Sequence, residues 1–305
     1  MDYELAVIGA GPAGVAAGIY AIRAGISTIV LEEKMVGGQI IISPWIENYP
    51  GYEQISGMEL ADIFKKHLQK YIEPNELEPV EDIKKDGDEF VIESCDSTYR
   101  VKAVILATGA TYRTLNVPGE GKFSGKGISF CATCDGFFFK DKKVAVIGGG
   151  NTAAIEALYL KNLGMDVHLI HRRDQLRAEA RYQKELEEKG VNIVYNTVVC
   201  CFQGDMKLER IELKDVNTEE HRIEDFDGAF ISIGLLPKTE LAKKLGVDLD
   251  EHGYIKVDDF QRTNVRGVYA AGDITGGARQ IVSSAAQGAQ AALASTEVLG
   301  KQYPF

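Results

Sequence analysis

The chain has 305 residues, of which 45% are hydrophobic, a length and composition typical of about two globular domains. Its formal net charge of −11 disfavours binding to nucleic acid or to an anionic membrane surface. Five cysteines are too few for an extracellular disulfide framework, and an odd number cannot all be paired within the chain. No targeting segment is apparent. We therefore expect a cytoplasmic protein that binds neither membrane nor nucleic acid.

The first element along the chain is a glycine-rich phosphate loop. The apolar run Glu4–Ile8 predicts a buried strand, and residues 15–23 have a helical pattern. Between them lies the GxGxxG spacing of dinucleotide-binding loops, with glycines at Gly9, Gly11 and Gly14. These glycines suit a tight turn, close approach to a pyrophosphate and tight helix packing, with the phosphates at the helix N-terminus.

The next predicted strand, residues 26–31, leads to an acidic residue. Glu32 lies 23 residues after Gly9. A carboxylate at this place accepts hydrogen bonds from a ribose hydroxyl and repels a 2′-phosphate. The first unit is therefore predicted to bind a dinucleotide that lacks a 2′-phosphate.

The following segments complete a first domain and lead into a second. We expect a helix over residues 57–71, a small antiparallel meander between residues 80 and 101, and a buried strand over 104–109. Residues 112–127 are rich in glycine, proline and polar residues and are interpreted as a linker.

A CxxC pair, Cys131 and Cys134, follows this linker. Tetrahedral zinc would need two further ligands, and the chain offers no second CxxC or CxxH, so no metal site is expected. A redox pair needs an accessible thiolate, a resolving thiol and a proton source, which Asp135 can supply. Because a hydride is not readily delivered to a disulfide in one step, a flavin is required, and the first nucleotide site is predicted to hold FAD.

The three other cysteines carry no suggestive spacing. Cys200 and Cys201 are adjacent in a strand-like run, and adjacent cysteines seldom bond because the ring is strained. We interpret both, with Cys95, as small apolar packing residues.

A second phosphate loop follows the predicted strand Lys143–Ile147. It reads GxGxxA, with Gly148, Gly150 and Ala153 at the three positions. At the same distance of 23 residues from its first glycine comes a basic cluster instead of an acid, made of His171, Arg172, Arg173 and Arg177. Arginines attract a 2′-phosphate, so this unit is predicted to bind NADPH.

The last third of the chain has no phosphate loop of its own. It contains predicted strands within residues 229–237 and 267–273 and a helix over 281–299. We expect it to complete the first sheet, so that the second unit is inserted within the first. The predicted fold is α/β, with two Rossmann-like, three-layer ββα domains: residues 1–113 with 245–305, and residues 114–244.

Taken in order, the motifs resemble the low-molecular-weight thioredoxin reductases nearly from end to end. The segments that carry the resemblance are 9–14, 37–39, 47–51, 107–109, 131–135, 148–153, 171–177, 270–273 and 279–280. The resemblance implies a homodimer that passes electrons from NADPH through FAD to thioredoxin or a thioredoxin-like protein. It also implies that Cys134 faces the flavin, that Cys131 attacks the partner disulfide and that Asp135 is the acid/base.

The same resemblance assigns the cofactor-binding residues. Those expected at FAD are Gly9, Gly11, Pro12, Ala13, Gly14, Glu32, Gly38, Gln39, Asn48, Thr108, Gly109, Gly272, Asp273, Arg279 and Gln280. Those expected at NADPH are Gly148, Gly150, Asn151, Thr152, His171, Arg172, Arg173, Arg177 and Gly234. The family further implies a rotating inserted domain, with chain crossings expected near Tyr112–Leu115 and Lys243–Gly246.

One departure and two alternatives stand beside this hypothesis. Many relatives carry paired acids in the helix after the second loop, where this chain has Ile155-Glu156, which could alter hydride-transfer geometry. A reductase using another donor, such as ferredoxin, is disfavoured by the intact basic cluster. A redox-sensing flavoprotein without turnover is disfavoured by the intact cysteine pair.

Overall fold

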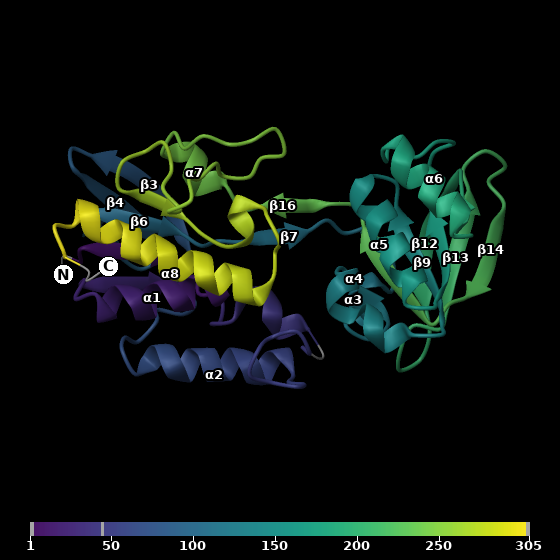
Figure 1. Cartoon of the computed structure of the whole chain (residues 1–305), viewed down its shortest axis with the longest axis horizontal. Helices are drawn as coiled ribbons and strands as arrows, with labels where there is room; N and C mark the ends of the chain where they lie inside the picture. The colour runs from purple at the N-terminus through teal and green to yellow at the C-terminus, as the bar shows by residue number, and fades with distance from the viewer. Residues whose placement is uncertain (1–2, 44–45, 303–305) are drawn as a thin grey trace. The chain divides into compact units, whose positions relative to one another are not determined.

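The computed structural model describes residues 3–43 and 46–302. The chain divides into two compact units (Figure 1). The first contains the chain up to Thr111 and from Leu236 onward, and the second contains Tyr112–Leu235. Among the described residues, no helix combines the length and the apolar character needed to cross a bilayer.

A parallel four-stranded sheet forms the centre of the first unit. Its order is β17-β6-β1-β2, with β1 at Leu5–Ile8, β2 at Thr28–Leu31, β6 at Ala103–Leu106 and β17 at Val268–Ala270. Every residue of these strands is buried, as expected for a parallel sheet covered on both faces. The C-terminal segment therefore supplies the edge strand β17, next to β6.

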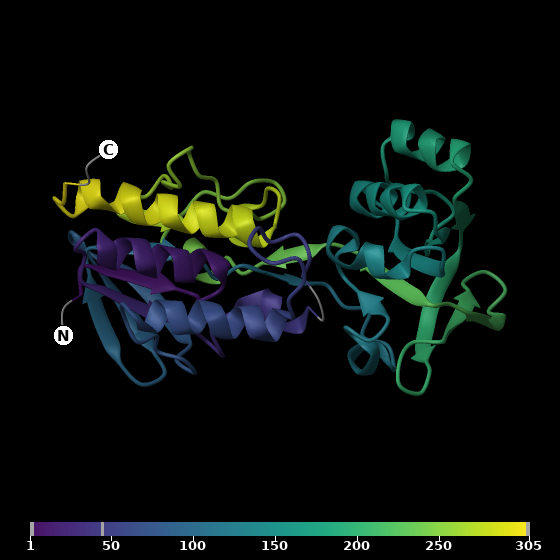
Figure 2. The same cartoon turned by 60° about the horizontal axis from the view of Figure 1, so that its bottom comes forward.

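Helices cover one face of this sheet. In both views α1 (Pro12–Arg23) lies between α8 (Ile281–Val298) and α2 (Gly57–Gln69) (Figures 1 and 2). A Cβ on Gly288 would lie 1.9 Å from the Ala13 carbonyl oxygen. The glycine in α8 therefore allows the backbones of α1 and α8 to approach closely.

An antiparallel meander covers the other face. It consists of β3 (Val80–Asp86), β4 (Glu89–Ser94) and β5 (Thr98–Val101). Buried apolar side chains of β3, β4 and β5 pack in one cluster with those of the parallel sheet. Short helices η1 (Gly38–Ile42), α7 (Glu240–Lys244) and η3 (Asp273–Thr275) complete the unit.

The second unit repeats this plan. Its parallel sheet has the order β11-β10-β9-β15-β8, with β8 at Ile128–Ser129, β9 at Lys143–Gly148, β10 at Asp166–Ile170, β11 at Asn192–Val194 and β15 at Gly228–Ser232. Helices α5 (Asn151–Asn162) and α6 (Ala180–Glu188) pack on each other, and α5 packs on β9, β10 and β15. The antiparallel layer is β12 (Thr197–Gln203), β13 (Arg210–Asp215) and β14 (His221–Asp225). The predicted α/β fold with two Rossmann-like units is confirmed.

The segment between the first sheet and the CxxC pair is more ordered than the linker that composition predicts. It contains β7 (Ala110–Tyr112) and the one-turn helix α3 (Glu120–Phe123). Helix α3 is held by Glu120, whose carboxylate accepts the backbone N–H groups of Leu115 and Asn116 at 2.9 and 2.8 Å. The buried Phe123 then anchors the segment in the core of the second unit.

The second segment of chain that joins the two units lies elsewhere than expected. Strand β16 (Leu235–Pro237) pairs with β7, and the boundary between the units falls after residue 235, whereas the sequence suggested one at 244. Helix α7 packs against β3 and so belongs to the first unit. Within residues 229–237, strand β15 ends at Ser232 and β16 begins at Leu235, because Gly234 between them has a φ of +106°.

Candidate active site and nucleotide sites

The first phosphate loop contains two glycines that no other residue can replace. A Cβ on Gly9, whose φ is +100°, would lie 2.4 Å from the Ala107 carbonyl oxygen. A Cβ on Gly14 would lie 1.8 Å from the Gly9 carbonyl oxygen. By contrast, a Cβ on Gly11 would meet nothing closer than 3.9 Å. Two glycines are thus needed for packing, and the third leaves the loop open.

This open loop leads into the N-terminus of α1. The N-cap residue is Gly11, and no side chain caps the helix. The first-turn N–H groups therefore lack a side-chain acceptor, and the helix dipole favours an anion beside them. Such a terminus fits the pyrophosphate of a dinucleotide.

Glu32 lies beside the loop. Its Oε2 accepts the backbone N–H of Ala10 at 2.6 Å, and its Oε1 accepts that of Lys34 at 2.9 Å. The residue as a whole is 9% exposed. Because an ionised carboxylate has about four acceptor positions, capacity remains for ribose hydroxyls.

Gly272 and Asp273 also approach the start of α1. A Cβ on Gly272, whose φ is +84°, would lie 3.0 Å from the Cβ of Ala13. Asp273 Oδ1 accepts a hydrogen bond from Ser284 at 3.2 Å. Burial raises the pKa of this carboxyl, while Ser284 and Arg279 oppose the shift. The ends of β1, β2 and β17 thus bring together backbone N–H groups and two carboxyls.

Other residues expected at the flavin are placed as follows. Asn48 Nδ2 donates to Gln280 Oε1 at 3.1 Å, joining two segments far apart in the sequence. Gln39 donates to the Ala110 carbonyl at 3.1 Å. Thr108 instead donates its hydroxyl to the Lys238 carbonyl at 2.8 Å, which ties the loop after β6 to the segment before α7. The structure therefore gives Thr108 an internal bond.

The second phosphate loop has the same construction. A Cβ on Gly148 would lie 2.5 Å from both the Ala153 Cβ and the Ser232 carbonyl oxygen. A Cβ on Gly150 would meet nothing within 4 Å, and Gly150 is the N-cap of α5, again with no side-chain cap. This terminus offers the same open N–H groups to a phosphate.

His171 joins the second loop to the basic segment. It is buried, and its Nδ1 and Nε2 lie 2.7 and 3.0 Å from the carbonyl oxygens of Gly148 and Gln175. The backbone N–H of Arg177 also donates to the Gly149 carbonyl at 2.7 Å. His171 therefore shapes the loop from within, which its place in the basic cluster did not reveal.

The three arginines of the basic cluster are exposed. Within residues 3–43 and 46–302, Arg172, Arg173 and Arg177 form no salt bridge. Their positive charges are therefore not neutralised by a neighbouring carboxylate, and guanidinium groups suit bidentate binding of a phosphate.

The helix after this loop carries Ile155, where the sequence resemblance leads us to expect an acid. Ile155 is 46% exposed on α5. The next residue, Glu156, accepts a hydrogen bond from Ser232 at the end of β15. Glu156 is thus held at the carboxyl edge of the sheet. The preceding position, where a second acid was expected, has the apolar side chain of Ile155.

The CxxC pair is a disulfide. Cys131 and Cys134 are bonded, and their Cα atoms lie 5.3 Å apart. The single turn α4 (Ala132–Asp135) holds them, with Cys131 at its N-cap and Ala132 fully buried. A Cβ on Gly136 would lie 2.8 Å from Leu160 of α5, so this glycine allows the turn to pack on the helix. The redox pair thus rests on the helix that begins at the second phosphate loop.

Asp135 lies immediately after the pair. Its Oδ2 accepts the Ser129 hydroxyl at 2.6 Å, whereas its Oδ1 is buried and is among the described polar atoms without a hydrogen-bond partner. Burial raises the pKa of this carboxyl, and the bond from Ser129 lowers it by less. A carboxyl with a raised pKa keeps its proton to higher pH, as a proton donor beside a disulfide requires.

Sequence reasoning did not identify Ser129. Its Oγ also accepts the backbone N–H of Cys131 at 3.1 Å, so it links the acid to the backbone of the disulfide. The only signal in the sequence is a serine two residues before the first cysteine, a spacing too common to be singled out.

Comparisons with known proteins agree with one another. Residues 3–290 match the family described as pyridine nucleotide-disulphide oxidoreductase. A thioredoxin reductase from Treponema pallidum (strain Nichols) is 41% identical over 301 residues, covering 98% of this chain and 97% of its own. A Clostridium pasteurianum protein described as a 34.2 kDa protein in rubredoxin operon is 39% identical and covers 97% of each chain. The crystal structure of thioredoxin reductase from Streptococcus pyogenes MGAS5005 has a TM-score of 0.92 at 38% identity, over 98% of each chain.

Proposed function

Because the chain belongs to the pyridine nucleotide-disulphide oxidoreductase family, we propose that it is an NADPH-dependent, FAD-containing reductase of thioredoxin or of a thioredoxin-like protein. Its resemblance to the low-molecular-weight thioredoxin reductases is confirmed by relatives about 40% identical over nearly the whole chain. The observation that carries the proposal is the Cys131–Cys134 disulfide, set beside a buried carboxyl on a unit with its own phosphate loop.

The first unit is the proposed FAD site. The open N-terminus of α1 would bind the pyrophosphate, Glu32 the ribose hydroxyls, and Gly272 with Asp273 the ribityl-phosphate region. When bound, a flavin supplies two-electron chemistry that links a nicotinamide to a disulfide. The chain's own part is to hold and orient the group and to exclude water from it.

The second unit is the proposed nicotinamide site. Phosphates would lie against the N–H groups at the start of α5, where Gly150 leaves open space. The exposed arginines beside the loop would bind the 2′-phosphate that distinguishes NADPH from NADH. His171 holds the basic segment against the loop.

The reduced cysteine pair performs thiol–disulfide exchange. The Cys131 thiolate attacks one sulfur of the partner disulfide, which forms a mixed disulfide and releases one partner thiolate. The Cys134 thiolate then attacks the Cys131 sulfur, which restores the Cys131–Cys134 disulfide and releases the second partner thiolate. The partner gains two electrons and two protons, and the cysteine pair is oxidised by two electrons.

Asp135 supplies a proton during this cycle. Burial keeps its carboxyl neutral to higher pH than an ordinary aspartate, and the Ser129 hydrogen bond fixes its orientation. Its free Oδ1 is the atom at which a proton can be held and passed.

Three further features belong to the proposal. The partner is thioredoxin or a protein with the same exposed disulfide, the assembly is a homodimer, and the compartment is the cytoplasm, where thiols are kept reduced.

The alternative of a reductase served by another donor, such as ferredoxin, is less well supported because it would leave the basic cluster without a ligand.

The test is a stopped-flow comparison of NADPH, NADH and reduced ferredoxin as reductants of the oxidised flavoprotein under anaerobic conditions. We expect NADPH to bleach the flavin fastest. The proposal fails if the flavin spectrum stays oxidised with NADPH although dithionite reduces it.

A further inference from the structure

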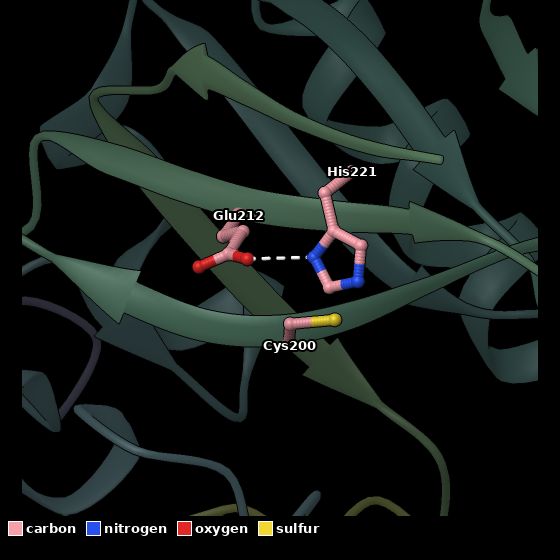
Figure 3. A group of neighbouring side chains, drawn as sticks. All are labelled: Cys200, Glu212 and His221. Carbon is pink, nitrogen blue, oxygen red and sulfur yellow. Dashed lines mark hydrogen bonds and ion pairs between the residues drawn. The ribbon is translucent and has the colours of Figure 1, made fainter. Parts of the chain in front are cut away.

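The antiparallel layer of the second unit carries a cluster that the redox function does not use. One ligand-type atom from each of three side chains lies within 4.8 Å of the others. The residues are Cys200 on β12, Glu212 on β13 and His221 on β14 (Figure 3). We propose that Cys200, Glu212 and His221 form a binding site for a zinc-class divalent metal ion, independent of the nucleotide and disulfide sites.

An irregularity in β12 creates this cluster. The register between β12 and β13 shifts between Val199 and Cys201, so Cys200 has no Cα partner and Cys201 pairs with Glu212. In a regular strand, neighbouring side chains point to opposite faces. The bulge instead brings both cysteines close to the same glutamate.

The donor atoms have the chemistry that zinc prefers. A thiolate, an imidazole nitrogen and a carboxylate oxygen together suit a borderline ion such as Zn²⁺, whereas a sulfur ligand disfavours Mg²⁺ and Ca²⁺. Metal–ligand bonds of about 2.0–2.3 Å place neighbouring ligands of a tetrahedral site about 3.3–3.8 Å apart. Glu212 Oε1 and His221 Nδ1 lie 2.7 Å apart, so a small opening of this pair would admit an ion (Figure 3).

A fourth side chain orients the carboxylate. Cys201 Sγ donates to Glu212 Oε2 at 3.1 Å, and Gln203 Nε2 donates to the same sulfur at 3.3 Å. The second oxygen of Glu212 is thereby fixed, and Oε1 is directed toward His221. Such outer contacts are typical of metal ligands and hold them in place.

Charge and proton balance are consistent with a divalent ion. On binding, the Cys200 thiol releases its proton to solvent and its sulfur bonds to the metal, while His221 binds as the neutral ring. The thiolate and the carboxylate then neutralise the two positive charges, and water completes the coordination. Lys214, whose positive charge acts on Cys200, pairs with Glu219 at 3.0 Å. The side chain of His221 is half exposed, so an ion can enter from solvent.

The test uses the FAD-loaded, oxidised protein, in which Cys131 and Cys134 are bonded and cannot bind metal. After treatment with a chelator, Co²⁺ is titrated and its ligand-field absorption is followed at wavelengths beyond the flavin bands, and Zn²⁺ is then added as a competitor. We expect one Co²⁺ per chain, displaced by Zn²⁺. Affinity should fall at least about 10-fold in Cys200→Ser and in His221→Gln, because each removes a direct ligand and even the loss of an outer contact costs about that much. Cys95→Ser, which removes the exposed cysteine of the first unit, should leave affinity unchanged.

A second measurement uses the unmodified chain and so does not depend on the folding of a variant. Saturating Zn²⁺ should slow alkylation of Cys200 at least about tenfold, as followed by peptide mass spectrometry, and should leave alkylation of Cys95 unchanged. Equal alkylation of Cys200 with and without Zn²⁺ overturns the proposal. So does an unchanged affinity for Co²⁺ in a folded Cys200→Ser protein.

Discussion

The Ser129 hydroxyl donates to Asp135 Oδ2 at 2.6 Å and leaves Oδ1 buried without a partner. The same serine accepts the backbone N–H of Cys131 at 3.1 Å, so one side chain joins the acid to the disulfide. This arrangement fixes the position of the carboxyl and supports the proposed role of Asp135 as proton donor in the exchange.

Replacement of Asp135 by asparagine should slow thioredoxin reduction about 10²-fold, because a positioned acid contributes about 10²–10⁴-fold to such steps. In the unmodified protein, burial raises the pKa of Asp135, so the rate should fall as the pH rises through that raised value. The variant should lack this dependence. The measurement is kcat/KM for thioredoxin against pH.

The contribution of Asp135 to folding stability should fall with rising pH, as the rate does. Because the folded-state pKa of Asp135 is raised, its contribution to stability is fully present below the unfolded value of about 3.9 and is lost as the pH rises through the folded value. Asp135→Asn should therefore flatten the dependence of Tm on pH in that window. Unchanged turnover and an unchanged pH profile in the variant would contradict the role of Asp135.

Replacing the arginines of the basic cluster by neutral residues should change KM for NADPH much more than KM for NADH. In Arg172→Gln/Arg173→Gln, we expect KM for NADPH to rise about 10- to 100-fold, since hydrogen bonds to charged groups contribute about 1.5–3 kcal/mol. KM for NADH should change little because NADH lacks the 2′-phosphate. Steady-state kinetics with both nucleotides checks this, and equal changes would show that these arginines do not bind that phosphate.

Gly150→Ala should test whether a ligand binds in the open space beside the second phosphate loop. The added Cβ meets nothing within 4 Å in the protein, so the variant should fold and keep FAD. It should nevertheless raise KM for NADPH because the methyl group would stand where the pyrophosphate is proposed to bind. Gly121→Ala is the matched control, since its Cβ also meets nothing within 4 Å but lies on α3. If both variants behave alike, the loop is not the phosphate site.

Ile155→Glu should create the pair of acids, with Glu156, that the family resemblance leads us to expect on α5. Ile155 is 46% exposed, so stability should not change measurably. We expect the rate of flavin reduction by NADPH to change by less than about tenfold, since Glu156 is already held by Ser232. Anaerobic stopped-flow kinetics measures this rate, with Ile155→Leu as control. A larger change would assign Ile155 a direct part in placing the nicotinamide.

The two nucleotide units could be predicted because glycine spacing and apolar runs are local signals. Gly14 is required by the Gly9 carbonyl oxygen and Gly148 by the Ala153 side chain, contacts within their own loops, and such requirements are visible in sequence. The boundary near residue 235 could not be predicted, because it depends on the pairing of β7 with β16, which lie far apart in the chain.

The functions of individual polar residues were harder to predict. His171 stands in a basic run, yet its ring is buried against two carbonyl oxygens, a contact that only the folded chain defines. Cys200 was interpreted as a packing residue because adjacent cysteines seldom form a disulfide, and the bulge that brings Cys200 close to Glu212 leaves no mark in the sequence.

The most direct test of the electron relay is Cys134→Ser, examined by anaerobic mixing with NADPH and then with oxidised thioredoxin. This variant cannot form the Cys131–Cys134 disulfide, so the flavin should still be reduced by NADPH while thioredoxin remains oxidised. Continued reduction of thioredoxin at the rate of the unmodified protein would contradict the proposed relay.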